Sequence, residues 1–198
     1  MASSPYRAPR LLIVPGLRDS GPTHWQTWLQ QQYRDARRVV QRDFSNPDLL
    51  RWAERIHSTL DHAGEGEWIA VAHSFGCLAL ARHLADHPDS PIRQVLFVAP
   101  AEPDKFGLAE LLPHHGLGRP STLIASQNDP WMSASSALRW AHRWGSNFSN
   151  LGPVGHINSE AGFGPFPLAK RWVDAARERA AREHRPAHAS FQEWSFAI

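Results

Sequence analysis

The chain has 198 residues, of which 42% are hydrophobic and 20% are charged, the ordinary balance of a globular protein. Its 21 basic and 19 acidic residues leave a net charge of +2, which gives no reason to expect nucleic-acid binding. No apolar run approaches the ~20 residues that span a bilayer, and residues 1–10 lack the apolar centre of a signal peptide. We therefore expect a cytoplasmic protein without a membrane association.

The length favours one domain over residues 1–198, with a core of about residues 10–183 and a tail, 184–198, whose order the sequence does not fix. The single cysteine, Cys77, excludes an internal disulfide and a cysteine metal cluster. His83 and His87 have the spacing of two metal ligands on a helix, but the sequence shows no third ligand. We interpret both as exposed helix residues and expect no metal and no cofactor.

Short apolar runs bounded by Gly or Pro alternate with segments of helical periodicity along the chain. The runs predict strands buried on both faces, and the periodic segments predict helices. The predicted elements are a strand at 10–15, a loop at 16–23, a helix at 23–36, a polar edge strand at 38–42, a helix at 47–64, a strand at 68–72, a helix at 77–83, strands at 92–99 and 121–126, a helix at 133–144, a strand at 147–151, a loop at 152–156 and a helix at 167–183. This alternation predicts an α/β fold with a mostly parallel, twisted sheet and helices on both faces.

Residues 100–120 are the longest stretch without a strong strand or helix signal. Long loops in compact domains tend to be functional, and this one leaves the carboxyl end of a strand, where open α/β sheets bind ligands. We expect it to form a small cap over a site.

The chain is organised around a strand, a sharp turn and a helix with Ser74 at the turn. In a nucleophile elbow the serine has strained backbone geometry, and small residues two before and two after it let the strand and helix pass closely. Ala72 and Gly76 occupy those positions, so the usual G-x-S-x-G pattern has Ala for its first Gly. This placement predicts that Ser74 is a nucleophile.

A serine nucleophile of this kind is followed in the chain by an acid and then by a histidine, and Asp129 and His156 stand in that order. Each of the three follows a predicted strand, so their side chains can meet at one edge of the sheet. His156 would be the general base and Asp129 would orient it. Asp104 also follows a strand and competes for the role of the acid, and Asp129 could instead be a turn residue before Pro130.

The oxyanion would be stabilised by two main-chain N–H groups. One belongs to Phe75, directly after the nucleophile, and the other to Leu17, where the preceding Gly16 allows close backbone approach. The other histidines fit the base less well. His57, His62, His83 and His87 fall on helices, His114 and His115 precede the acid, and His73 should point into the fold.

Several blocks together resemble the small α/β-hydrolases of the YdeN and retinoblastoma-binding-protein-9 type. They are Pro15-Gly16, Ser20-Gly-Pro-Thr-His-Trp25-Gln26, Ala72-His-Ser-Phe-Gly-Cys77, Ser126-Gln-Asn-Asp-Pro-Trp131, Gly155-His-Ile-Asn-Ser-Glu160 and Gly162-Phe-Gly-Pro165. The resemblance covers roughly residues 10–175. It implies a single-domain α/β-hydrolase fold with a minimal cap and with Ser74, Asp129 and His156 as the catalytic triad.

The same resemblance suggests that His24 and Trp25 shape the substrate pocket, and we expect Gly16 and Trp131 to bind substrate as well. For His24 and Trp25 the alternative is ordinary packing at a helix start. The predicted function is that of a carboxylesterase-like serine hydrolase, which cleaves a small carboxylic ester, or an amide or thioester, through an acyl-enzyme. The alternative is a protein-binding module on a hydrolase fold. The expected partner is a small-molecule ester substrate, and the oligomeric state is left open.

Overall fold

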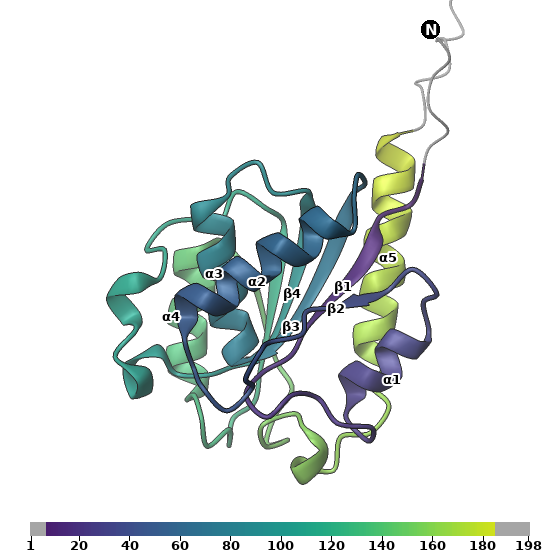
Figure 1. Cartoon of the computed structure of the whole chain (residues 1–198). Coiled ribbons are helices and arrows are strands. Elements are labelled where there is room, and N and C mark those ends of the chain that lie inside the picture. Colours follow the sequence, from purple (N-terminus) through teal and green to yellow (C-terminus); the bar gives the residue numbers. More distant parts are fainter. Residues whose placement is uncertain (1–6, 185–198) are drawn as a thin grey trace, which may run out of the picture.

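A computed structural model describes residues 7–184 of the chain. Its six strands form one parallel sheet in the order β2-β1-β3-β4-β5-β6 (Figure 1). The strands are β1 (Arg10–Val14), β2 (Arg37–Arg38), β3 (Trp68–Ser74), β4 (Ile92–Pro100), β5 (Ser121–Ala125) and β6 (Asn147–Asn150). The central position of β3 puts its carboxyl end, which carries Ser74, in the middle of one edge of the sheet.

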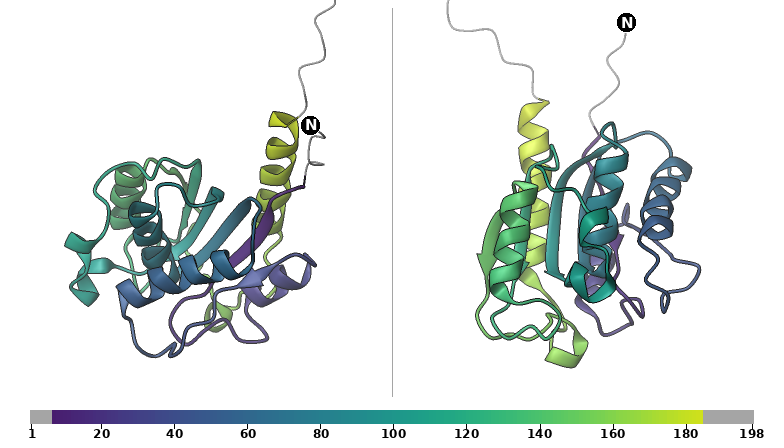
Figure 2. Two further views of the ribbon diagram at one scale, coloured as in Figure 1. Left: turned by 45° about the horizontal axis from the view of Figure 1, so that its top comes forward. Right: turned by 90° about the vertical axis from the view of Figure 1, so that its left-hand side faces the viewer.

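Helices cover both faces of the sheet, as the alternating pattern predicted (Figure 2). The α-helices are α1 (Trp25–Gln31), α2 (Leu49–His62), α3 (Phe75–Asp86), α4 (Ala134–Trp144) and α5 (Pro167–Glu183), and the 3-10 helices are η1 (Pro103–Phe106), η2 (Ala109–Leu111) and η3 (Ser159–Ala161). Side chains of α2, α3 and α4 form one buried cluster with the sheet, and those of α1 and α5 form the other. The predicted α/β architecture, a parallel sheet with helices on both faces, is thereby confirmed. None of the helices in residues 7–184 is both long enough and apolar enough to traverse a bilayer.

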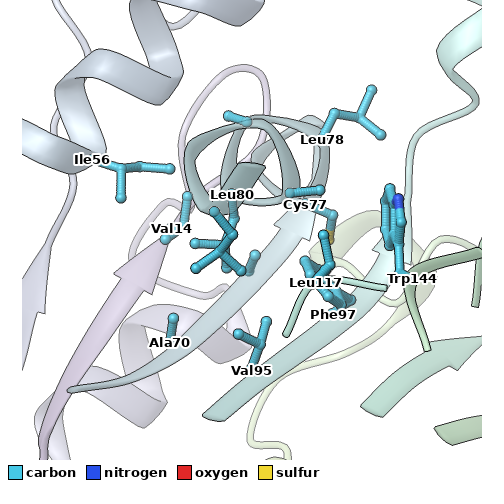
Figure 3. Packing of buried hydrophobic residues seen from close by; sticks show 14 of the residues in the cluster. Val14, Ile56, Ala70, Cys77, Leu78, Leu80, Val95, Phe97, Leu117 and Trp144 are labelled. Carbon is cyan, nitrogen blue, oxygen red and sulfur yellow. The ribbon is translucent and has the colours of Figure 1, made fainter. Parts of the chain in front are cut away.

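The inner strands β1, β3, β4 and β5 are mostly apolar and largely buried, as expected for strands covered on both faces. Along β1, Leu12 and Val14 face the α3 side, whereas Leu11 and Ile13 belong to the cluster under α1 and α5. Figure 3 shows Val14 beneath α3 with its neighbours on the sheet. Two fully packed faces fix the strand register, since a slip of one residue would exchange the two faces.

The largest differences from the predicted bounds lie in three segments. Helix α1 ends at Gln31 and not near Ala36, because the chain turns there and the Tyr33 hydroxyl donates a hydrogen bond of 2.7 Å to Asp174 on α5. The edge strand is only Arg37–Arg38. Segment 100–120, predicted as a loop, contains η1 and η2.

Two further expectations concern the end of the chain and the histidines of α3. The predicted tail, 184–198, lies outside the described residues except for His184. The expectation that His83 is exposed is wrong: its side chain is fully buried, because α2 packs across that face of α3.

Candidate active site

Ser74 ends β3 with φ 53° and ψ −126°, a backbone conformation that is strained for any residue with a side chain. Close packing on both sides maintains it. A Cβ on Gly76 would overlap the carbonyl oxygen of Pro15, and a Cβ on Gly16 would lie 2.7 Å from Ser74 Cβ. The two glycines therefore let the end of β1 pass directly beside the serine and the start of α3.

A continuous hydrogen-bond chain joins Ser74, His156 and Asp129. The Nε2 atom of His156 lies 2.9 Å from Ser74 Oγ, and its Nδ1 atom lies 2.9 Å from both carboxylate oxygens of Asp129. The side chains of His156 and Asp129 are 8% and 2% exposed, so water competes little for these contacts. Asp104, the competing acid, is exposed on η1. The structure thus brings together the three residues that the sequence placed in order.

The loop that carries His156 is held by polar side chains at the end of β5. The hydroxyl of Ser126 accepts from the Val154 N–H at 3.1 Å, and the Asn128 carbonyl oxygen accepts from the Gly155 N–H at 2.7 Å. Asp129 itself also accepts from the main-chain N–H of Trp131 at 2.8 Å. These contacts fix the carboxylate and the imidazole relative to each other.

Trp25 lies behind His156 and not in the pocket. It is fully buried, and its indole N–H donates a hydrogen bond of 2.7 Å to the carbonyl of Ile157. Ile157 has φ 49°, which is unusual for a β-branched residue. The structure therefore places Trp25 as an anchor of the strained turn after His156, and the interpretation as packing at the helix start fits this position better than pocket lining.

Two neutral imidazoles lie beside His156. The ring of His73 is 4.9 Å from the rings of both His24 and His156, and its Nε2 donates to the His156 carbonyl at 3.0 Å. Burial, followed by the charge of Arg38, lowers the pKa of His24 to about 4. Burial also lowers the pKa of His73 well below its ordinary value. Neither ring therefore adds a positive charge next to His156 at neutral pH.

The loop between β1 and α1 is fixed by buried polar groups that the sequence reasoning did not single out. Arg38 pairs with Asp19 at 2.8 Å and donates to the Ser20 carbonyl at 2.9 Å. The amide of Gln26, which is fully buried, donates to the carbonyls of Val14 and Val71 at 3.1 Å each. The signal in the sequence that could have indicated these groups is the Ser20 to Gln26 block. It contains Gln26, a polar residue at a helix position that is buried in the structure.

A pocket of about 460 Å³ opens beside Ser74 and His156. His24 and Trp131, two of the predicted pocket residues, line it together with Leu17 and with Phe106 of η1, whereas Gly16 does not. The side chain of Phe75 instead packs in the core against Trp52 and Phe106, with ring centroids 5.0 and 5.1 Å away. Its main-chain N–H stands at the first turn of α3, where amide groups have no partner within the helix.

A larger hollow of about 720 Å³ lies over α2, away from Ser74. The only hydroxyl side chain lining it is Ser58, which donates to the Arg55 carbonyl of its own helix. No base adjoins that hydroxyl among the described contacts, so the smaller pocket is the candidate active site.

The parallel sheet, the strained serine at the carboxyl end of a central strand and the ordered acid and histidine define the class of the α/β-hydrolases. A family model described as serine hydrolase matches residues 11–177. A YdeN-like hydrolase of Pectobacterium atrosepticum is 37% identical, with a TM-score of 0.79 over 84% of this chain and 90% of that one. The chain belongs to the serine hydrolase family of small, YdeN-like α/β-hydrolases.

More distant solved structures share the fold. The ydeN gene product of B. subtilis is 22% identical, with a TM-score of 0.69 over 84% of this chain and 97% of that one. A Bacillus cereus carboxylesterase is 18% identical, with a TM-score of 0.56 over 85% of this chain and 89% of that one. A search of curated proteins returns no significant match.

Proposed function

We propose that the protein hydrolyses small carboxylic esters through an acyl-enzyme formed on Ser74. The observation that supports this most directly is the chain of 2.9 Å contacts from Ser74 Oγ through His156 to Asp129. A serine hydroxyl is a poor nucleophile unless a positioned base removes its proton. Amides and thioesters form the same acyl-enzyme, so they belong to the same proposal.

In the first half-reaction, Ser74 Oγ bonds to the acyl carbon as His156 Nε2 takes the hydroxyl proton. The electron pair of the carbonyl π bond moves to its oxygen. When this oxyanion collapses, the bond to the leaving oxygen breaks, and His156 returns its proton to release the alcohol. In the second half-reaction His156 activates a water, which attacks the acyl carbon, and Ser74 leaves with the proton as the carboxylic acid is released.

The oxyanion is held by the main-chain N–H groups of Leu17 and Phe75. Support comes from the packing of Gly16, since a Cβ there would lie 3.4 Å from Ser74 Oγ. The main chain at residues 16–17 therefore passes beside the reacting hydroxyl, while Phe75 follows it directly. Donors in such fixed positions stabilise developing charge without reorganisation.

The surrounding charges favour a transient proton on His156. The carboxylate of Asp129 faces its Nδ1, and the neutral rings of His24 and His73 place no like charge against it. Burial strengthens the attraction between Asp129 and an imidazolium, because little water screens it.

The pocket favours a compact substrate with an apolar part. Its volume of about 460 Å³ is at the small end for ligand sites. Leu17, Phe106 and Trp131 offer apolar surface, and Trp131 is 43% exposed at the mouth. A short acyl group fits between these residues and Ser74.

Labelling with a fluorophosphonate tests the proposal, since this reagent reacts quickly only with an activated serine. We expect one adduct per chain, mapped by mass spectrometry to Ser74 and lost in Ser74→Ala. The matched control is Ser58→Ala, which removes the serine in the hollow over α2. This variant should be labelled like the wild type. An adduct on another serine would contradict the assignment. No adduct, together with no hydrolysis of general esters, would favour a binding module on a hydrolase fold.

A further inference from the structure

A second group of histidines lies on the face of the sheet covered by α2 and α3. His57 comes from α2, His83 from α3, and His87 directly follows α3. One ring nitrogen from each of the three lies within 4.8 Å of the others. The third ligand that the sequence did not show is thus supplied by the neighbouring helix.

His83 has an unsatisfied nitrogen inside the protein. The residue is fully buried, and its Nε2 lies 2.9 Å from Ser90 Oγ. Its Nδ1 is buried and has no partner within hydrogen-bond geometry, although the main chain of Ala53 on α2 interacts weakly with the ring. Such orphaned groups are rare in folded proteins and call for an explanation. A metal-ligating histidine commonly has this arrangement, with one nitrogen on the ion and the other held by a hydrogen-bonding side chain.

The other two rings lie close to His83 but are stacked in parallel, so they would have to rotate to direct their nitrogens at one ion. The rings of His57 and His87 are stacked with centroids 4.1 Å apart and planes at 3°, and the rings of His83 and His87 are 4.9 Å apart. Nitrogens bound to one tetrahedral Zn²⁺ are roughly 3.3 Å apart, given Zn–N bonds of about 2.0–2.1 Å. His57 and His87 are half-buried, so rotation of their side chains can close the difference.

The chemistry of the group favours a particular kind of ion. All three donors are imidazoles, and the nearby carboxylate of Asp86 is already paired with Arg82 at 2.7 Å. Burial, followed by the neighbouring His87 and His57, lowers the pKa of His83 to about 3, so its ring is neutral at physiological pH. Neutral imidazoles suit zinc, copper and nickel, whereas magnesium and calcium prefer oxygen ligands.

An entry path exists on the outer side of the group. His87 lines the hollow of about 720 Å³ over α2, so a hydrated ion can reach this ring from solvent. This hollow contains none of the residues proposed for the hydrolysis.

We propose that His57, His83 and His87 form a binding site for a late first-row divalent metal ion, Zn²⁺ above all, with water as the fourth ligand. Such an ion joins α2 to α3. Since Ser74 immediately precedes α3, the ion also braces the helix that supports the serine. The site takes no part in the proposed chemistry at Ser74, and it stands or falls independently of that proposal.

Titration calorimetry with ZnCl₂ in a non-coordinating buffer at pH 7.5 tests this. We expect the wild-type chain to bind one Zn²⁺, and His57→Gln and His87→Gln each to weaken binding at least tenfold. His62→Gln is the matched control, because His62 is exposed on the same helix as His57, and its affinity should stay within twofold of the wild type. Unaltered binding in both His57→Gln and His87→Gln, or no binding up to 1 mM Zn²⁺, would overturn the proposal.

A second measurement distinguishes the proposed site from the histidines near Ser74. Co²⁺ should give the intense visible absorption of a four-coordinate site in the wild type, and His57→Gln should abolish it. His24→Gln should leave the absorption intact. Loss of the signal in His24→Gln but not in His57→Gln would place the ion at the Ser74 pocket and reject the proposed site. Neither the Zn²⁺ titration nor the Co²⁺ measurement uses a His83 variant. A folding defect caused by changing that buried residue therefore cannot obscure the result.

Discussion

Trp25 on α1 donates a 2.7 Å hydrogen bond to the carbonyl of Ile157, which lies 132 positions further along the chain. Ile157 directly follows His156. The acceptor is a residue with positive φ, so the contact holds a strained turn in place. The proposed base is therefore positioned from two directions, by Asp129 on its ring and by Trp25 on the main chain of the next residue.

Trp25→Phe should remove this hydrogen bond while keeping an aromatic ring in the core. We expect the free energy of unfolding to fall by about 1–3 kcal/mol, the usual cost of leaving a buried carbonyl unsatisfied. We also expect kcat/KM to fall by about tenfold or more, because small displacements of a catalytic group are costly. Urea unfolding and ester hydrolysis measure the two effects. Trp28→Phe, the same change on the same helix, is the control, and equal losses in both variants would argue against a specific role for the contact.

Asp129→Asn should lower kcat by up to about 10⁴, the drop seen when a triad acid becomes an amide and the histidine takes the wrong tautomer. Asp104→Asn is the control. Asp104 is exposed on η1, so its loss should cost less than about tenfold. Circular dichroism should first show that both variants are folded. The reverse ranking of the two rates would move the acid to Asp104.

Gly76→Ala should severely destabilise the protein. Its new methyl group would overlap the Pro15 carbonyl oxygen and lie 2.7 Å from that of Val14, and both are main-chain atoms of a buried strand end. Overpacking of this kind costs typically ~1–3 kcal/mol, and rigid backbone leaves little room for relief. At Gly164 a Cβ meets no atom within 4 Å, so Gly164→Ala should be nearly neutral. Thermal unfolding of the two variants gives the comparison, and a tolerated Gly76→Ala would refute the close approach of β1 and α3.

The stability of the protein should fall as the pH drops below about 6.5. Burial lowers the pKa of His24 to about 4 and that of His83 to about 3, whereas in the unfolded chain histidines titrate near 6.5. Between these values the unfolded state binds more protons, so the free energy of unfolding decreases with falling pH, by up to about 1.4 kcal/mol per pH unit for each such histidine.

Urea unfolding between pH 6.5 and 5 measures this slope above the range in which most carboxylates titrate. His24→Gln should make the slope shallower by up to one such contribution. A wild-type stability that is flat over this interval would contradict the buried, neutral state of these rings.

Short acyl chains should be preferred over long ones. In a pocket of about 460 Å³, kcat/KM for p-nitrophenyl esters should level off or decline beyond about eight carbons. A pocket long enough to bury the chain would instead add ~0.8 kcal/mol for each methylene. Rates measured with Ser74→Ala give the background hydrolysis to subtract. A steady rise beyond eight carbons would show that the acyl group is buried elsewhere.

The sequence was most informative around Ser74, where a catalytic residue type coincides with a clear strand and helix pattern. The strand and helix on either side of Ser74 could be recognised because a β-branched run stops at a serine flanked by Ala72 and Gly76. The order of serine, acid and histidine then placed all three at one edge of a parallel sheet, and the structure brings them into hydrogen-bond contact. Their catalytic roles remain predictions.

Contacts between distant segments were beyond such reasoning. Nothing local to Trp25 indicates that its indole N–H reaches Ile157. The burial of His83 likewise depends on how α2 crosses α3, which helical periodicity does not specify. The end of α1 was missed because the chain turns after Gln31 and Tyr33 makes a long-range hydrogen bond to Asp174 on α5, which local periodicity does not indicate.

The two outer strands of the sheet have a consequence for the behaviour of the protein at high concentration. β2 is a pair of arginines, and β6, Asn147–Asn150, is a polar strand of four residues. An exposed edge that is long and apolar recruits strands from other chains and starts aggregation, whereas short, charged or polar edges discourage it. The sheet of residues 7–184 therefore presents its apolar strands only in its interior, and a variant that lengthened β2 with β-branched residues should precipitate more readily than the wild type.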